Sequence, residues 1–350
     1  MKRVAKRAKG ENGKIDIRGV AARAGVSIAT VSRTMNHVPT VDAALAERVW
    51  EAVKELNYLP NTQARALVSG KSKLLGLIVS EITNPFFPEL IQEFENVAVR
   101  HGYELLIAST NYERKKMEEC ARRMLERKVD GVAVMTFGIE DFLFERFAAD
   151  KVPVVFVDAA PERPMSSALA VDYRVGISEG VRHLVGLGHT KIGFITGPLR
   201  LRSAQARRTA FVDAMRRAKM GVEKSWIVEG EHTLESGRDA IVKLLAMKER
   251  PTAVMCSNDM TAIGVQHGLF EAGLRVPDDL SLIGFDDIHL AEYTIPPLTT
   301  VRMSCKDLAE RAVGGLLAHL KGAAEEAAGK IPTRLIVRQT TGAVKSRRGK

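Results

Sequence analysis

Cysteine is scarce in this chain of 350 residues. Its three cysteines, Cys120, Cys256 and Cys305, stand far apart, and no C-x-x-C pair occurs. A sparse and odd number excludes a disulfide framework and favours the reduced thiols of a cytoplasm. The eight histidines form no H-E-x-x-H motif and no paired Cys/His spacing. We therefore expect no metal site and no cofactor.

Long apolar runs are also missing, although hydrophobic residues make up 45% of the chain. No stretch approaches the roughly 18 consecutive apolar residues that a membrane span needs. No apolar run follows the basic N-terminus, so no secretory signal is expected. The sequence predicts a cytoplasmic protein without a membrane partner, long enough for two or three compact units.

Positive charge is unevenly distributed within the net charge of +10. Residues 1–73 hold 14 Lys and Arg against 6 Asp and Glu, whereas the remainder holds 38 against 36. A basic segment of this kind is the electrostatic footprint of a phosphate-binding module. Residues 1–13 lack periodicity and are predicted to be a disordered basic tail, which adds either nonspecific DNA affinity or only solubility.

The stretch Ile17–Asn36 predicts two short helices around a tight corner. Gly25 and Val26 turn the chain, and the Ser27 hydroxyl is placed to cap the second helix. The inward positions of the first helix are Val20, Ala21 and Ala24. Those of the second helix are Val31 and Met35, which leaves Ile28, Ala29, Ser32 and Arg33 on its outer face.

A third amphipathic run completes this pattern through Leu45, Val49, Val53 and Leu56, at steps of four, four and three residues. Three short helices with a glycine corner and a small, polar outer face are typical of a helix-turn-helix DNA reader. Three ordinary helices of a larger core are the alternative.

From Leu74 onward, short apolar runs alternate with amphipathic stretches of helical period. The predicted strands are Leu74–Val79, Glu104–Ala108, Val132–Met135, Val154–Val157, Ala168–Val171, Ile192–Ile195, Ile227–Val228, Ala253–Cys256 and Leu282–Phe285. The predicted helices are Glu89–His101, Arg114–Lys128, Ala204–Lys219, Glu235–Met247 and Met260–Ala272. This alternation predicts an α/β fold with parallel sheets, and the number of strands favours two similar lobes.

Two segments carry a family resemblance: V-A-A-R-A-G-V-S-I-A-T-V-S-R-T-M-N from Val20, and L-N-Y-L-P-N-T-Q-A-R-A-L from Leu56. On these residues the chain is identified as a member of the lactose-repressor-type LacI/GalR family. The resemblance implies a helix-turn-helix domain (14–60), a hinge (61–72) and an effector-binding domain (73–345). That domain would have two Rossmann-like lobes of the periplasmic-binding-protein type, about 73–172 with 303–331 and about 173–302 with 332–345.

The resemblance also implies the DNA contacts. Ile28 and Ala29 occupy base-choosing positions, but apolar groups make no bidentate hydrogen bonds, so we expect Arg33 and Thr30 to carry more of the discrimination. Leu67 is the expected minor-groove wedge of the hinge, with a plain linker as the alternative. The remaining expected DNA-binding residues are Ser27, Ser32, Asn36, Asn61 and Arg65.

The effector is expected outside the carboxyl ends of the strands, where polar and aromatic residues follow several predicted strands. The resemblance makes Arg207 the ligand-gripping arginine. The expected effector-binding residues are Phe86, Phe87, Asp158, Asp172, Ser203, Arg207, His232, Asn258 and Asp286. Leu201 and Ala159 depart from the purine-binding branch of the family, which disfavours a purine. The basic cluster Arg200, Arg202 and Arg207 near Ser203 hints at a sugar acid. Exposed loop charges are the alternative for Arg200 and Arg202, and a neutral sugar remains equally open.

The motif Gly176–Gly180 matches the G-x-S-x-G pattern of hydrolases. Asp172 already occupies the turn at the preceding strand's end, so Ser178 is expected inside a helix and not at a nucleophile elbow. We therefore expect no enzyme, and the missing export signal argues against a transport sugar-binding protein. The predicted function is a repressor that binds a palindromic operator as a homodimer, with its affinity switched by a sugar or sugar-acid effector.

Overall fold

The computed structural model describes residues 16–36, 38–59, 70–135, 141–157, 165–323 and 329–344. The chain divides into two compact units, Met1–Ser72 and Lys73–Lys350. The predicted basic tail and most of the predicted hinge lie outside the described residues. Among the described residues, no helix is both long and apolar enough to cross a membrane.

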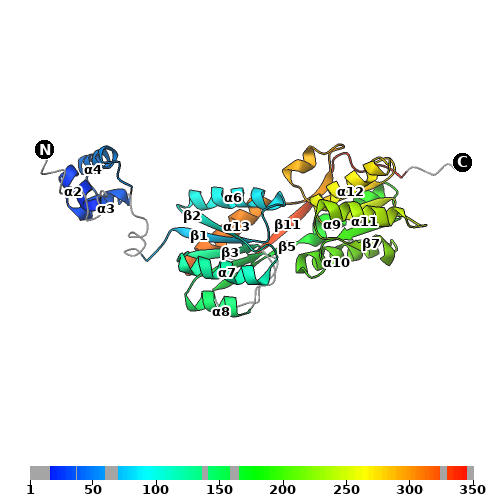
Figure 1. Ribbon diagram of the computed structural model, residues 1–350, viewed down its shortest axis with the longest axis horizontal. Coiled ribbons are helices and arrows are strands. Elements are labelled where there is room, and N and C mark those ends of the chain that lie inside the picture. Colours follow the sequence, from blue (N-terminus) through cyan, green and yellow to red (C-terminus); the bar gives the residue numbers. More distant parts are fainter. Residues whose placement is uncertain are drawn as a thin grey trace. The chain divides into compact units, whose positions relative to one another are not determined.

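The first unit contains three helices, α2 (Ile17–Ala24), α3 (Ile28–Met35) and α4 (Ala43–Glu55) (Figure 1). Gly25 ends α2 with a left-handed φ of 65°, a conformation that glycine adopts without steric cost. The Ser27 hydroxyl accepts a hydrogen bond from the backbone N–H of Thr30 at 3.1 Å and so caps α3, as predicted.

The core of this unit consists of Val20, Ala21, Ala24, Val31, Val49 and Ala52, with Met35, Val53 and Leu56 packed against it. Leu45 was expected in this core, but it is only half-buried and lies outside the cluster. Because each helix is short, one small buried stripe per helix is enough to join all three.

The second unit has an eleven-stranded sheet in the order β2-β1-β3-β4-β5-β11-β10-β9-β8-β6-β7. Its first five strands are β1 (Leu74–Val79), β2 (Glu104–Ser109), β3 (Gly131–Met135), β4 (Val154–Val157) and β5 (Ser166–Asp172). The next five are β6 (Ile192–Thr196), β7 (Ile227–Glu229), β8 (Ala253–Cys256), β9 (Ser281–Asp286) and β10 (Thr299–Met303). The nine predicted strands are all present.

Strand β11 (Gly329–Ile336) joins the two halves of the sheet. Residues 329–332 pair in parallel with β5, and residues 333–336 pair antiparallel with β10. The apolar pattern predicted neither β10 nor β11, whereas the family resemblance implied crossings between the lobes near Met303 and Ile331. The halves therefore form two α/β lobes that share crossing strands.

Helices cover both faces of each lobe. The first lobe carries α6 (Phe86–Arg100), α7 (Arg114–Glu126), α8 (Asp141–Ala149) and α13 (Cys305–Leu320). The second carries α9 (Tyr173–Gly186), α10 (Arg202–Arg217), α11 (Leu234–Leu245) and α12 (Asp259–Glu271), with short turns η1 (Lys224–Trp226) and η2 (His289–Glu292). In the first lobe, α6 and α13 lie on one face of the sheet, with α7 and α8 on the other (Figure 1). Strands buried on both faces explain why their sequences are continuously apolar.

Candidate functional site

The outward face of α3 is small and mostly polar. Ile28 is 46% exposed, and Ala29, Arg33 and Asn36 are exposed beside it. Thr30 and Ser32 are half-buried, and the Thr30 hydroxyl lies 2.9 Å from the Ser27 hydroxyl. The expected hinge residues Asn61, Arg65 and Leu67 lie outside the described residues.

The second unit contains a cavity at the carboxyl ends of the strands, where a ligand is expected in an open α/β sheet. Met135, Val157, Asp286 and Met303 are the last residues of β3, β4, β9 and β10, and all four line it. Seven of the expected effector-binding residues also line this cavity: Phe86, Phe87, Ser203, Arg207, His232, Asn258 and Asp286. The cavity therefore gathers residues from both lobes.

Two other expected residues are not placed in this lining. The Asp172 carboxylate accepts a hydrogen bond from Arg174 N at 3.2 Å and caps α9, so its neighbour Tyr173 faces the cavity instead. Asp158 lies outside the described residues.

The basic cluster that hinted at a sugar acid does not form at the cavity. Arg200 is exposed and pairs with Glu231 at 3.0 Å, and Arg202 is exposed at the start of α10. Neither arginine lines the cavity, and Leu201 between them does. Arg200 and Arg202 are therefore exposed charges in this structure, as the alternative interpretation expected.

Arg207 is the principal cation of the cavity wall. One guanidinium nitrogen, Nη1, donates to Ser257 O at 2.6 Å, and Nη2 lies 3.7 Å from Asp286 Oδ1. The guanidinium also lies over the rings of Phe285 and Tyr173, at 4.3 and 5.0 Å from their centres. Its Nε is buried with no hydrogen-bond partner among the described residues. A fixed cation with an unused donor is suited to hold an oxygen of a ligand.

Asp286 faces Arg207 from the end of β9 with a φ of 107°, a strained backbone for a residue other than glycine. Burial raises the pKa of its carboxyl to about 7, although Arg207 lowers that pKa and Glu89 raises it. Its Oδ1 also has no hydrogen-bond partner among the described residues. The carboxyl group is therefore available to accept a proton or a hydrogen bond from a ligand.

His232 contributes a neutral imidazole. Burial, followed by the positive charges of Arg207 and Arg200, lowers its pKa to about 3. Its Nε2 lies 3.0 Å from Ser257 Oγ. The ring fits only because residue 197 is glycine, since a Cβ there would lie 1.9 Å from Nε2.

Sequence reasoning missed several lining residues, above all Tyr112 and Tyr173. The Tyr112 hydroxyl donates to Glu81 Oε1 at 3.2 Å, which holds its ring at the first-lobe wall. Tyr112 comes three residues after β2, so the search for polar and aromatic residues after predicted strands could have found it. Ser80 is another polar lining residue that was missed, whereas Asn84, which also lines the cavity, stood among the polar residues after predicted strand ends.

Comparison with known proteins agrees with this architecture. Residues 16–61 match the family model of bacterial regulatory proteins of the lacI family, and residues 181–341 match a periplasmic binding protein-like domain. The HTH-type transcriptional repressor PurR of Aliivibrio salmonicida is 35% identical over 306 residues, 87% of this chain and 92% of that protein. PurR of Vibrio cholerae is 37% identical over 87% of this chain and 91% of its own length. The chain belongs to the lacI family.

Solved structures support the same assignment for this lacI-family protein. The lac repressor dimer bound to operator and the anti-inducer ONPF has a TM-score of 0.82 and 30% identity, covering 94% of this chain and 100% of that one. A CelR–cellobiose complex has a TM-score of 0.70 and 26% identity, covering 93% and 100%. A regulator from Enterococcus faecium with bound ribose has a TM-score of 0.69 and 26% identity, covering 78% and 100%.

The hydrolase-like motif of this lacI-family protein lies within a helix. Ser178 belongs to α9, which runs from Tyr173 to Gly186, as expected from the sequence. The nucleophile of a G-x-S-x-G elbow needs the sharp turn between strand and helix. Asp172 and Tyr173 occupy that turn here.

The raised pKa of Asp286 predicts a pH-dependent stability. The folded protein keeps this proton up to about pH 7, whereas the unfolded chain loses it near pH 3.9. The stabilisation is therefore complete below the unfolded pKa and is lost as the pH rises through the folded pKa. Between pH 5 and 8, wild type should lose on the order of 2 kcal/mol of unfolding free energy relative to Asp286→Asn.

Urea unfolding at intervals across this pH range measures the difference between the two proteins. Wild type must be compared with Asp286→Asn because the lowered pKa of His232 makes both proteins more stable as the pH rises. Parallel stability curves for wild type and Asp286→Asn would contradict the assignment of the raised pKa to Asp286.

Proposed function

We propose that this lacI-family protein is a cytoplasmic transcriptional repressor that binds a palindromic operator as a homodimer. A small molecule in the cavity between the lobes would set its affinity for DNA. The observation that carries the proposal is a cavity between the lobes lined by Arg207 and Asp286, whose buried Nε and Oδ1 atoms have no hydrogen-bond partner among the described residues. Such groups are costly to leave unpaired unless a ligand uses them.

The effector that these groups favour is neutral and hydroxylated, as a sugar is. A hydroxyl group both donates to Asp286 and accepts from Arg207, whereas a carboxylate has no hydrogen to donate to Asp286. Phe86 and Phe87, in edge contact at 5.4 Å between ring centres, provide an apolar wall for a sugar face. Similar regulators hold cellobiose and ribose, which supports this class for this protein.

The homodimer has a candidate surface on the second lobe. Phe270 on α12 is 78% exposed, and Tyr293 and Ile295 after η2 are 66% and 92% exposed. Gln266, one turn before Phe270, donates to Pro296 O at 3.1 Å, so the helix and this loop are neighbours. Large apolar groups gathered on a surface mark an interface. We propose that a second copy covers them.

The proposed switch is a linkage between ligand and DNA. Effector binding between the two lobes would change their relative position, and with it how the paired first lobes meet and whether two hinges and two α3 helices fit the operator. A coupling of about 1 to 3 kcal/mol, a 5- to 150-fold change in DNA affinity, is enough for such a switch. The test is a thermal-shift screen of sugars, sugar acids and nucleosides, followed by operator binding with and without the compound found.

This experiment has a clear negative outcome. If the protein prefers no genomic site over random duplex at physiological salt, with or without any compound that stabilises it, the proposal is wrong. A stabilising sugar acid would retain the repressor but overturn the neutral effector. Loss of operator binding in Leu67→Ser would support the proposed hinge wedge.

Arg33 is the base-reading residue that we propose on the exposed face of α3. Arg33→Ala should weaken operator binding by about 5- to 150-fold, the value of one bidentate base contact, and relax the preference at one base pair. Binding to a library of operators with single substitutions measures both effects. Arg18→Ala, an exposed arginine of α2, is the control. A uniform loss across all sequences would instead identify Arg33 as a phosphate contact.

A further inference from the structure

A hydrogen bond joins the two lobes beside the cavity. Glu89 lies in the first turn of α6 in the first lobe, and its Oε1 accepts from the backbone N–H of His289 at 2.8 Å. His289 begins η2, directly after the loop that follows β9 of the second lobe. The bond therefore connects segments 200 residues apart in sequence.

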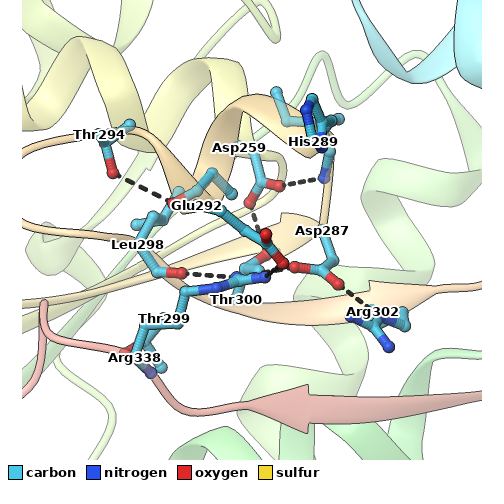
Figure 2. A network of polar contacts seen from close by, with 12 residues as sticks. Asp259, Asp287, His289, Glu292, Thr294, Leu298, Thr299, Thr300, Arg302 and Arg338 are labelled. Carbon is cyan, nitrogen blue, oxygen red and sulfur yellow. Dashed lines mark hydrogen bonds and ion pairs between the residues drawn. The ribbon is translucent and has the colours of Figure 1, made fainter.

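The second-lobe side of this contact is held firmly. Asp287 forms ion pairs with Arg302 of β10 and, at 2.7 Å, with Arg338, which follows β11. Asp259, at the start of α12, accepts from Ile288 N at 2.9 Å and from Thr300 Oγ1 at 2.5 Å. Figure 2 shows these carboxylates between β10, the chain after β11 and the loop that carries His289. The N–H that reaches Glu89 is thus presented by a fixed backbone.

Residues next to both partners of this bond also line the effector cavity. Phe86 and Phe87 lie just before Glu89 on α6, and Asp286 lies three residues before His289. A neighbouring groove is lined by both sides of the contact, including Glu89, Glu93, Asp287, His289 and Lys306. Separation of the lobes at this edge would break the bond and open the cavity together.

We propose that the Glu89 carboxylate and the His289 N–H form a latch that holds the two lobes closed, with Asp287 as the residue that positions it. A hydrogen bond to a charged acceptor is stronger than one between neutral groups. Its removal should shift the equilibrium between closed and open lobes about tenfold or more toward the open form. The latch goes beyond the proposed function and does not depend on the identity of the effector.

Glu93 provides a matched control. It lies one helical turn beyond Glu89, carries the same charge and lines the same groove. A nonspecific effect of acidic charge on lobe closure would therefore appear equally in Glu93 variants. An effect of the latch would appear only in variants of Glu89 and Asp287.

The experiment measures the distance between the lobes in the full chain without effector. Spin labels are attached at Lys115→Cys on α7 and Lys243→Cys on α11, both exposed positions, in a Cys305→Ser background. Cys120 and Cys256 are buried. Labelled protein is diluted into an excess of unlabelled protein, so that double electron–electron resonance reports distances within one subunit.

The expected result is a single short distance in wild type and Glu93→Leu, and a second, longer distance in Glu89→Leu and Asp287→Asn. Glu89→Gln, which keeps a neutral acceptor, should fall between them. If the distance distribution of folded Glu89→Leu matches that of wild type, the latch is overturned. Failure of this test leaves the DNA and effector experiments unaffected.

If Glu89→Leu does not fold, amide hydrogen exchange in wild type and Glu89→Gln tests the latch instead. The His289 amide should exchange at least about tenfold more slowly in wild type than in Glu89→Gln. Equal exchange in wild type and Glu89→Gln would also overturn the latch.

Discussion

Replacing Arg207 with methionine is expected to weaken effector binding by about 100-fold or more, while operator binding without effector persists. Truncating one partner of a buried, hydrogen-bonded charge typically costs about 2 to 5 kcal/mol of binding free energy. Arg207 is 7% exposed and lines the cavity, and its buried Nε has no hydrogen-bond partner among the described residues. Methionine fills similar space over Tyr173 and Phe285 but offers no donor.

Arg208→Met is the matched control, because Arg208 is the next residue of α10 and its side chain is exposed. Calorimetric titration with the compound found in the screen measures both variants. An equal loss of affinity in the two would mean that positive charge on α10 acts at long range. The proposed grip by Arg207 would then be wrong.

Gly264→Ala is expected to destabilise the second unit by about 3 kcal/mol, near the upper limit for overpacking a tight interface. Helices α11 and α12 pack against each other through Gly237 and Gly264. A Cβ at residue 264 would lie 1.9 Å from Leu234 O. The obstructing atoms belong to the backbone, so the two helices must move apart and no side chain can relieve the contact.

Gly314→Ala makes the same substitution inside α13, where a Cβ meets nothing within 4 Å. It should stabilise the protein by about 0.5 to 1 kcal/mol, the difference in helix propensity between alanine and glycine. Unfolding midpoints in urea compare the two variants directly. Similar midpoints would show that α11 and α12 tolerate a methyl group between them and that their close approach is not required.

The elements that sequence patterns predicted well are those whose patterns are local. Parallel strands buried on both faces are continuously apolar, so β1, β3 and β8 were recognisable without neighbours. The apolar pattern missed strands β10 and β11 because threonine, arginine and lysine interrupt their apolar residues. They become strands because β9 and β5 provide edges for pairing.

The candidate site shows the same division. A search for polar residues after strand ends found Asn258 and Asp286, and it also selected Asp172, whose carboxylate caps α9 instead. Whether a residue at a strand end faces the cavity or the following helix depends on backbone rotation at that residue. Within α10, the direction in which each residue points decides its environment: Arg202 is exposed and Arg207 is buried.

By itself, the sequence determined the helix-turn-helix head, the basic charge around it and the alternation of strands and helices. These depend on residue periods and on single residues such as Gly25 and Ser27. Tertiary structure alone decided which side chains meet in the cavity and that Glu89 reaches His289. Those contacts join segments up to 200 residues apart, and no local pattern encodes the distance between them because that distance follows from packing of the whole sheet.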